Sequence, residues 1–157
     1  MINIIKKTDK KLIAFGLGSN LGNREKNLEE AVFQLKKDLN LTKIKQSKIL
    51  VNKAMLLPNS PKEWDIDFFN IALTAEINLE KFSPLKILEI IKKIEKNLGR
   101  NNEQRWSPRV IDIDILLIKD TKINIANKLI IPHYDLENRT FFTKTLSEIL
   151  PDYLEFI

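Results

Sequence analysis

The stretch "RWSPRVIDIDILLI", residues 105–118, decides the fold and also contains the least expected residues of the chain. Its last nine residues are almost wholly apolar and predict a strand, yet Asp112 and Asp114 interrupt them. Side chains alternate along a strand, so the two aspartates are predicted to share one face, about 7 Å apart. The residues predicted to share the other face, which must be buried against helices, are Ile111, Ile113, Ile115 and Leu117.

The aspartate pair has two interpretations. Two carboxylates could lie on the solvent face of a sheet, but like charges in adjacent same-face positions repel each other. A cation between them removes that cost, and two carboxylates together with substrate phosphates commonly hold Mg²⁺. Only five of the 26 basic residues are arginine, and four of these lie between residues 100 and 139. Since arginine grips phosphate bidentately, this distribution favours a phosphate-binding region.

Working outward, the pattern of the chain predicts strands at 11–17, 42–51, 67–77 and 110–118. A helix over 24–40 has Asn20 or Asn23 as its cap, and a second helix begins at Ser83 and Pro84 and ends at Gly99. Residues 52–66 and 100–108 are predicted loops, with a small hairpin in 121–135 and a short helix at 143–150. The order β-α-β-β-α-β predicts an α+β, ferredoxin-like single domain over 1–157, with both main helices on one face of an antiparallel sheet.

Three further segments carry candidate site residues. "GLGSNLGNR" holds three of the four glycines, but it fits neither dinucleotide nor P-loop spacing and favours a tight strand-to-helix turn. "DFFN" places Phe68 and Asn70 on one strand face, where a buried amide could bind the edge of a planar heterocycle while the ring stacks. "PHYDLENRTF" joins the only histidine, His133, to a tyrosine and an arginine, which suits phosphate contact as well as a structural role.

Composition excludes several classes of protein. No apolar run approaches the roughly 20 residues of a membrane span, and cysteine is absent, which removes disulfides, thiolate metal sites and cysteine nucleophiles. The net charge of +5 is mostly that of a lysine-rich surface. These features lead us to expect a cytoplasmic protein that binds neither membrane nor nucleic acid.

Taken together, the quoted segments with "DFFNIAL", "IEKNLGR" and "IPHYDLENRTF" resemble the 6-hydroxymethyl-7,8-dihydropterin pyrophosphokinase family of folate synthesis, over about residues 11–153. The resemblance implies transfer of the β,γ-pyrophosphate of ATP to the hydroxymethyl group of the pterin, with release of AMP. It implies ATP as co-substrate, two Mg²⁺ ions, and a loop over 101–108 that closes on the site. Members of the family occur fused to neighbouring folate enzymes, so association with such enzymes is also implied.

Site residues follow from the same resemblance, position by position. The expected catalytic residues are Arg100, Arg109, Asp112 and Asp114, of which the two aspartates would bind Mg²⁺. The expected ATP contacts are Glu95, Trp106, Lys128, His133, Tyr134 and Arg139. The expected pterin contacts are Asn20, Asn52, Met55, Phe68, Asn70 and Phe141.

Two other functions remain open on the residues alone. An RNA-recognition domain shares the order of elements, but it has a characteristic aromatic motif on its third strand, and "FFNIALTAE" lacks that motif. A metal-dependent nuclease or phosphatase could use the same acidic pair. That activity would leave Phe68, Asn70 and Phe141 without a role.

Overall fold

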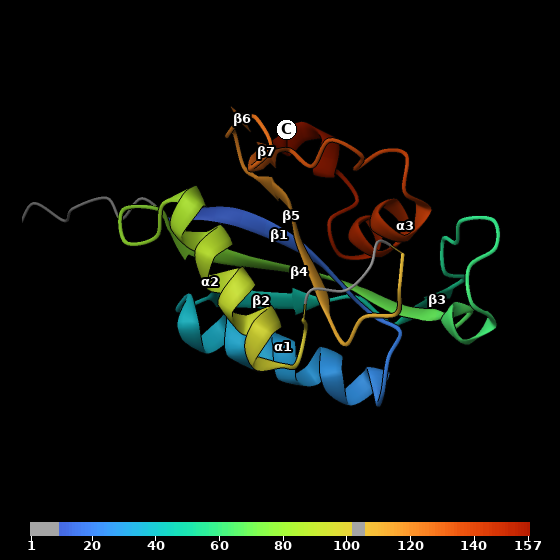
Figure 1. The fold of residues 1–157 in the computed structure, drawn as a ribbon. Helices are drawn as coiled ribbons and strands as arrows, with labels where there is room; N and C mark the ends of the chain where they lie inside the picture. The colour runs from blue at the N-terminus through green and yellow to red at the C-terminus, as the bar shows by residue number, and fades with distance from the viewer. Residues whose placement is uncertain (1–9, 102–105) are drawn as a thin grey trace, which may run out of the picture.

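The chain folds around one antiparallel sheet, which the computed structural model describes within residues 10–101 and 106–157 (Figure 1). The order across the sheet is β2-β4-β1-β5, and a further short strand, β3, also pairs with β4. The strands are β1 (Lys10–Ser19), β2 (Thr42–Gln46), β3 (Leu50–Asn52), β4 (Phe68–Asn78) and β5 (Asp112–Ile118). With α1 (Arg24–Asp38) after β1 and α2 (Pro84–Asn97) after β4, this is the predicted ferredoxin-like arrangement.

The ends of the two main helices follow their local sequence. Asn23 caps α1 by accepting a hydrogen bond from the backbone N–H of Lys26. Ser83 caps α2 in the same way, and Pro84 is its first residue. Gly99 follows α2 with φ of +105°, a left-handed conformation that glycine adopts without strain. These ends confirm the predicted second helix. They also show that Asn23, rather than Asn20, caps the first helix.

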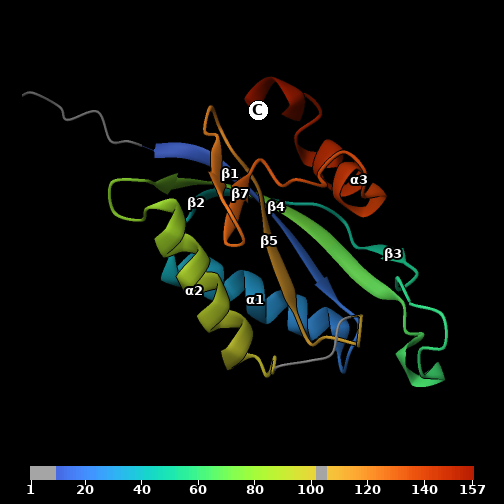
Figure 2. The same cartoon turned by 45° about the horizontal axis from the view of Figure 1, so that its top comes forward.

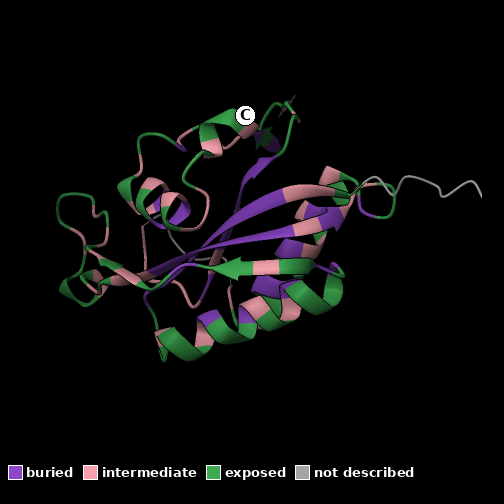
Figure 3. Cartoon of the chain, turned by 180° about the vertical axis from the view of Figure 1, so that it is seen from behind, coloured by how far each residue is buried: buried purple, intermediate pink, exposed green. Residues whose placement is uncertain are grey.

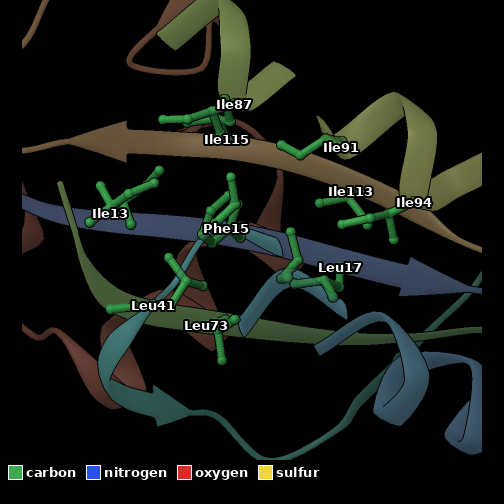
Figure 4. Close-up of a cluster of buried hydrophobic side chains, with 14 of the residues drawn as sticks. Ile13, Phe15, Leu17, Leu41, Leu73, Ile87, Ile91, Ile94, Ile113 and Ile115 are labelled. Atoms are coloured by element: carbon green, nitrogen blue, oxygen red, sulfur yellow. The ribbon is translucent and has the colours of Figure 1, made fainter. Parts of the chain in front are cut away.

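The main core lies between the sheet and the two helices, which lie together on one of its faces (Figure 2). Alternate residues of β1, β4 and β5 point into it, and α2 covers the face with Ile87, Ile91 and Ile94 (Figure 4). The inward-facing residues of the strands include Ile13, Phe15, Leu17, Leu73, Ile113 and Ile115. Figure 3 shows that β1, β4 and β5 are largely buried, whereas β2 and the two main helices carry many exposed residues. Burial on this scale is the main force that stabilises the fold.

A second, smaller core covers part of the opposite face of the sheet. There α3 (Thr140–Ile149) and the C-terminal residues pack on Ala14, Ala72, Leu116 and Leu117. The predicted hairpin is also present as β6 (Ile123–Ile125) and β7 (Leu129–Ile131). Because α3 covers only part of this face, the rest of it is available for a site. No helix in the described part of the chain is long and apolar enough to span a membrane.

One residue of β5 was predicted to lie on the wrong face of the sheet. Ala14 pairs with Leu117 and Phe15 pairs with Ile115, so Leu116 is an extra residue that forms a β-bulge. The bulge reverses the alternation, and Leu117 therefore packs in the smaller core rather than beside Ile115. The prediction rested on regular alternation of side chains between the two faces, and an inserted residue breaks that alternation.

Three boundaries also differ from prediction. The strand expected over 42–51 is two strands, because the hydroxyl of Ser47 takes the place of a backbone acceptor and binds the N–H of Ala72 at 2.9 Å. The loop expected over 52–66 contains a short 3-10 helix, Lys62–Trp64. The last helix begins at Thr140 rather than residue 143, and no side chain caps it, so its start leaves no sequence signal.

Candidate active site

Three neighbouring strands form the floor of the candidate site on the face that α3 leaves open. Across them Asn70 of β4 pairs with Gly18 of β1, and Gly18 pairs with Asp112 of β5. Adjacent strands lie about 4.8 Å apart, so the amide and the carboxylate are about 10 Å apart at the backbone. Gly18 between them carries no side chain, which leaves room above the sheet. Two residues along these strands, Gly16 pairs with Asp114 in the same manner.

A pocket of about 270 Å³ lies over this floor, close to the smaller volumes found for small-molecule sites. The predicted site residues that line it are Asn52, Met55, Phe68, Asn70, Trp106, Arg109, Asp112, Asp114, Tyr134, Arg139 and Phe141. They come from β3, β4, β5, the segments flanking them and the start of α3. The pocket thus brings together residues from both the expected pterin set and the expected ATP set.

One end of the pocket is lined by an amide and by aromatic rings. Asn70 is only 6% exposed, and its amide N–H₂ donates to Oδ1 of Asn52. Phe68 lies on the same strand face, and Phe141 enters from α3, where its ring packs against that of Phe142 at 4.7 Å. An amide edge with flanking rings suits a flat heterocycle that carries hydrogen-bonding groups.

Gly18→Ala should weaken binding of the pterin that the sequence leads us to expect by about tenfold, while leaving the protein folded. A Cβ at this position would lie 2.7 Å from Oδ1 of Asn70, closer than contact allows, so the amide must move. Isothermal titration with the pterin checks this result, and a thermal melt reports the fold. Unchanged pterin affinity in a folded Gly18→Ala protein would show that the position of Asn70 does not matter.

The other end of the pocket holds the two aspartates with their arginines. Arg100 donates from Nη1 to Oδ1 of Asp112 at 2.8 Å. Arg109 lies on the other side, with Nη1 at 3.6 Å from Oδ2 of the same carboxylate. Asp114 faces His133, whose Nε2 lies 3.7 Å from Oδ1. The arrangement is a paired acidic centre with cationic groups around it.

The pKa of Asp112 is raised from 3.8 to about 6 in the protein alone. Burial is the largest cause and repulsion by Asp114 the next, and together they outweigh the attraction of Arg100 and Arg109. The carboxylate is therefore ionised at neutral pH against an unfavourable environment. A bound cation would offset the cost of burying this charge and its repulsion by Asp114.

Asp112→Asn should stabilise the metal-free protein at neutral pH. The folded pKa of Asp112 lies above its unfolded value, so this carboxyl favours folding at low pH, and that benefit is lost as pH rises from about 4 through 6. The melting temperature of Asp112→Asn relative to wild type should thus increase over this range and level off near pH 7. Added Mg²⁺ should reduce this difference in melting temperature, because it stabilises the wild-type protein.

A difference in melting temperature between Asp112→Asn and wild type that stays constant from pH 4 to pH 7.5 would contradict the expected titration of Asp112. Asp38→Asn is the matched control, because Asp38 is an exposed residue at the end of α1. Its melting temperature should follow that of wild type across the same pH range.

The residues of the site could supply some of the ligands of a Mg²⁺ ion whose coordination is completed by phosphates. Among the described residues, no group of three or more histidine, cysteine or acidic side chains is placed to hold a metal. Two adjacent carboxylates in a pocket that also holds Arg109 and Arg139 suit an ion that keeps water and phosphate oxygens as its other ligands.

A cluster at the start of α3 forms another wall. Asp135 donates its backbone N–H to Nδ1 of His133, which leaves the Nε2 proton of the neutral ring facing Asp114. The ring of His133 stacks on Tyr134 at 4.7 Å. Arg139 donates to Asp135 at 2.8 Å and to the hydroxyl of Tyr134 at 3.2 Å. The bond from Arg139 holds the pKa of Asp135 below its ordinary value.

Five predicted site residues do not line the pocket. Asn20 is buried and joins two loops, since it accepts from the N–H of Arg109 at 2.8 Å and donates to the carbonyl of Ile66 at 3.1 Å. Glu95 and Arg100 lie beside β5, where Glu95 accepts from the backbone of Ile113 and Arg100 donates to Asp112. His133 lies behind Asp114, and Lys128 is exposed in the turn between β6 and β7. Of the loop expected to close over the site, residues 102–105 lie outside the described residues.

Several pocket residues were not predicted. They are Gly16, Leu17, Gly18, Lys53, Ser107 and Phe142. The glycines had a detectable signal, because a strand that alternates glycine with apolar residues leaves one face bare. Lys53 and Ser107 belong to irregular segments, where no periodicity indicates direction.

Comparison with known proteins identifies relatives of the chain. A family model described as 7,8-dihydro-6-hydroxymethylpterin-pyrophosphokinase (HPPK) matches residues 14–151. A 2-amino-4-hydroxy-6-hydroxymethyldihydropteridine pyrophosphokinase of Aquifex aeolicus is 39% identical over 142 residues, covering 90% of this chain and 82% of that protein. A folate synthesis bifunctional protein of Chlamydia caviae is 43% identical over 145 residues, covering 92% of this chain. The chain spans only 31% of that bifunctional protein.

Solved structures share the fold at low sequence identity. One is an HPPK-DHPS in complex with substrates, with a TM-score of 0.60 and 16% identity over 91% of this chain and 40% of that one. Another is the Plasmodium falciparum HPPK-DHPS with SDX-DHP, with a TM-score of 0.57 and 17% identity over 90% of this chain and 40% of that one. At such identity the likeness concerns the fold alone.

Proposed function

The chain belongs to the 7,8-dihydro-6-hydroxymethylpterin-pyrophosphokinase family, and we propose that it transfers diphosphate from ATP to 6-hydroxymethyl-7,8-dihydropterin, releasing AMP. The observation that carries the proposal is the row Asn70, Gly18 and Asp112 across three strands. The row supports the proposal because the Asn70 amide, which could bind the edge of a heterocycle, and the acidic pair line one pocket, with Gly18 between them.

In the proposed reaction, the hydroxyl oxygen of the pterin bonds to the β-phosphorus of ATP. The bond from that phosphorus to the oxygen bridging to the α-phosphate breaks, AMP leaves, and the hydroxyl proton is released to solvent. The β- and γ-phosphates thus move together. Such transfers depend mainly on positioning and on stabilising charge.

The protein's own groups supply the positioning. Asn70 would bind the polar edge of the pterin, and Phe68 and Phe141 would flank its ring, directing the hydroxymethyl group toward β5. Arg109 and Arg139 would bind the triphosphate, while Arg100 lies against the acidic centre. Asp112 and Asp114 would hold Mg²⁺, which when bound neutralises charge on the phosphates. The Trp106 side chain lines the pocket and would help to exclude water.

A coupled assay for AMP tests the proposal. The protein, Mg²⁺ and ATP should yield AMP rapidly when the hydroxymethyl-dihydropterin is present and only slowly without it. An equal rate with and without the pterin would contradict the proposal and would favour an acidic-pair hydrolase instead. The bifunctional relatives support a further proposal, that the chain works beside other enzymes of folate synthesis.

A further inference from the structure

We propose that Glu95 is a positioning residue that fixes Arg100 and the aspartate-bearing strand relative to each other, and that it does not bind the nucleotide. The inference rests on the proposed function, because Arg100 and the aspartates are placed in its catalytic centre. Glu95 lies near the end of α2 and is only 3% exposed. A carboxylate so buried is poorly accessible to a ligand and would repel a triphosphate at close range.

The first partner of Glu95 is the strand that carries the aspartates. Oε2 of Glu95 accepts the backbone N–H of Ile113 at 2.9 Å, and Ile113 is the residue between Asp112 and Asp114. Among the described strands β5 lies at an edge of the sheet, so its outward N–H groups have no neighbouring strand there to bind. The carboxylate supplies the missing acceptor at the one residue that both aspartates flank.

The second partner is the arginine. The same Oε2 accepts from Nη1 of Arg100 at 2.8 Å, and Nη1 also donates to Asp112 at 2.8 Å. The backbone adds a further link, because the N–H of Arg100 donates to the carbonyl of Glu95 at 3.0 Å. A single oxygen thus connects the strand backbone and the guanidinium, and the guanidinium in turn connects to the acidic centre.

This connection has a consequence for the reaction. Charge-assisted bonds to a buried carboxylate are short and directional, so they restrict where the Arg100 guanidinium can lie relative to Asp112. Without the carboxylate charge, Arg100 would be held by Asp112 more strongly than by α2. It would then lie over the acidic centre that the phosphates must reach. Glu95 should therefore affect turnover through Arg100.

A double-mutant cycle tests the inference. Glu95→Gln should lower the rate of diphosphate transfer in a single turnover about 10- to 100-fold, the scale for groups that orient other site residues. It should leave the affinity for the pterin unchanged. In an Arg100→Met background, the same Glu95→Gln change should lower the rate several-fold less than it does in wild type. Equal effects in both backgrounds would overturn the inference.

Binding of a non-hydrolysable ATP analogue provides an independent readout. If Glu95 acts through Arg100, Glu95→Gln should not change the affinity for the analogue once Arg100 is already methionine. A loss of affinity in that background would identify Glu95 as a nucleotide ligand and would also overturn the inference. If Glu95→Gln does not fold, Glu95→Asp replaces it in the same cycle, because the shorter side chain withdraws the oxygen while keeping its charge.

The matched control is Glu89→Gln on the same helix. Glu89 is 73% exposed and pairs only at 3.7 Å with Lys86, so its variant should leave the rate of each background unchanged. Wild-type activity is measured first, which separates the two claims. Absence of pterin-dependent AMP from wild type is a failure of the proposed function, whereas activity with additive effects is a failure of the role of Glu95 alone.

Discussion

Asp114→Asn is expected to lower the turnover number by roughly a thousandfold while leaving pterin affinity close to that of wild type. The substitution removes one of the two carboxylates proposed to hold Mg²⁺ but keeps the shape of the side chain. Asp114 lies opposite Gly16, two residues along the strands from the row that carries Asn70. The pterin end of the pocket should therefore be undisturbed. Steady-state AMP formation and pterin titration measure the two quantities separately.

The control for this variant is Asp38→Asn, which removes the same charge from an exposed position on α1. It should have wild-type turnover. Two results would count against the proposed role of Asp114. One is turnover within tenfold of wild type at saturating Mg²⁺, and the other is an equal loss of pterin affinity, which would indicate a disturbed strand.

Arg109→Met should lower turnover by about 100- to 1,000-fold and raise the KM for ATP. The side chain lines the pocket beside Asp112, and the backbone on which it sits is held on both sides by Asn20. The N–H of Arg109 donates to Oδ1 of Asn20 at 2.8 Å, and its carbonyl accepts from the N–H of Asn20 at 3.0 Å. The backbone bonds do not depend on the side chain, so the variant should keep its fold.

Arg109→Lys distinguishes charge from geometry. Lysine keeps the positive charge without the planar fork that binds phosphate bidentately, so it should recover only part of the lost rate. Full recovery would show that charge alone suffices. Lys37→Met, at an exposed position in the last turn of α1, controls for the loss of one positive charge and should not alter the rate.

Much of the fold could be predicted because its signals are local. The start and end of α2 are marked by Ser83, Pro84 and Gly99, and the structure places each in the expected role. The bulge at Leu116 could not be predicted, because an inserted residue in an apolar run leaves the composition of the run unchanged. The break at Ser47 depends on a bond to Ala72, a residue distant in sequence.

The site was predictable to a different degree for different residues. Alternation was enough to place Asp112 with Asp114, and Phe68 with Asn70, on the pocket face. It could not show that Asn70 and Asp112 share a row, because that depends on how three strands align. Alternation also could not distinguish a residue that lines the pocket from one that supports the pocket from outside, such as Asn20. Only its partners in space reveal the supporting role.

The bulge in β5 also bears on how accurately the chain folds. Residues before it enter one core and Leu116 and Leu117 enter the other, so both layers of the protein fix the alignment of this strand with β1. A slip by one residue would turn Asp112 and Asp114 toward the isoleucine core and would expose the isoleucines. A misaligned chain therefore loses burial on both sides at once. Molecules that reach a stable folded state should have their aspartates correctly directed, and few should be trapped as folded but inactive protein.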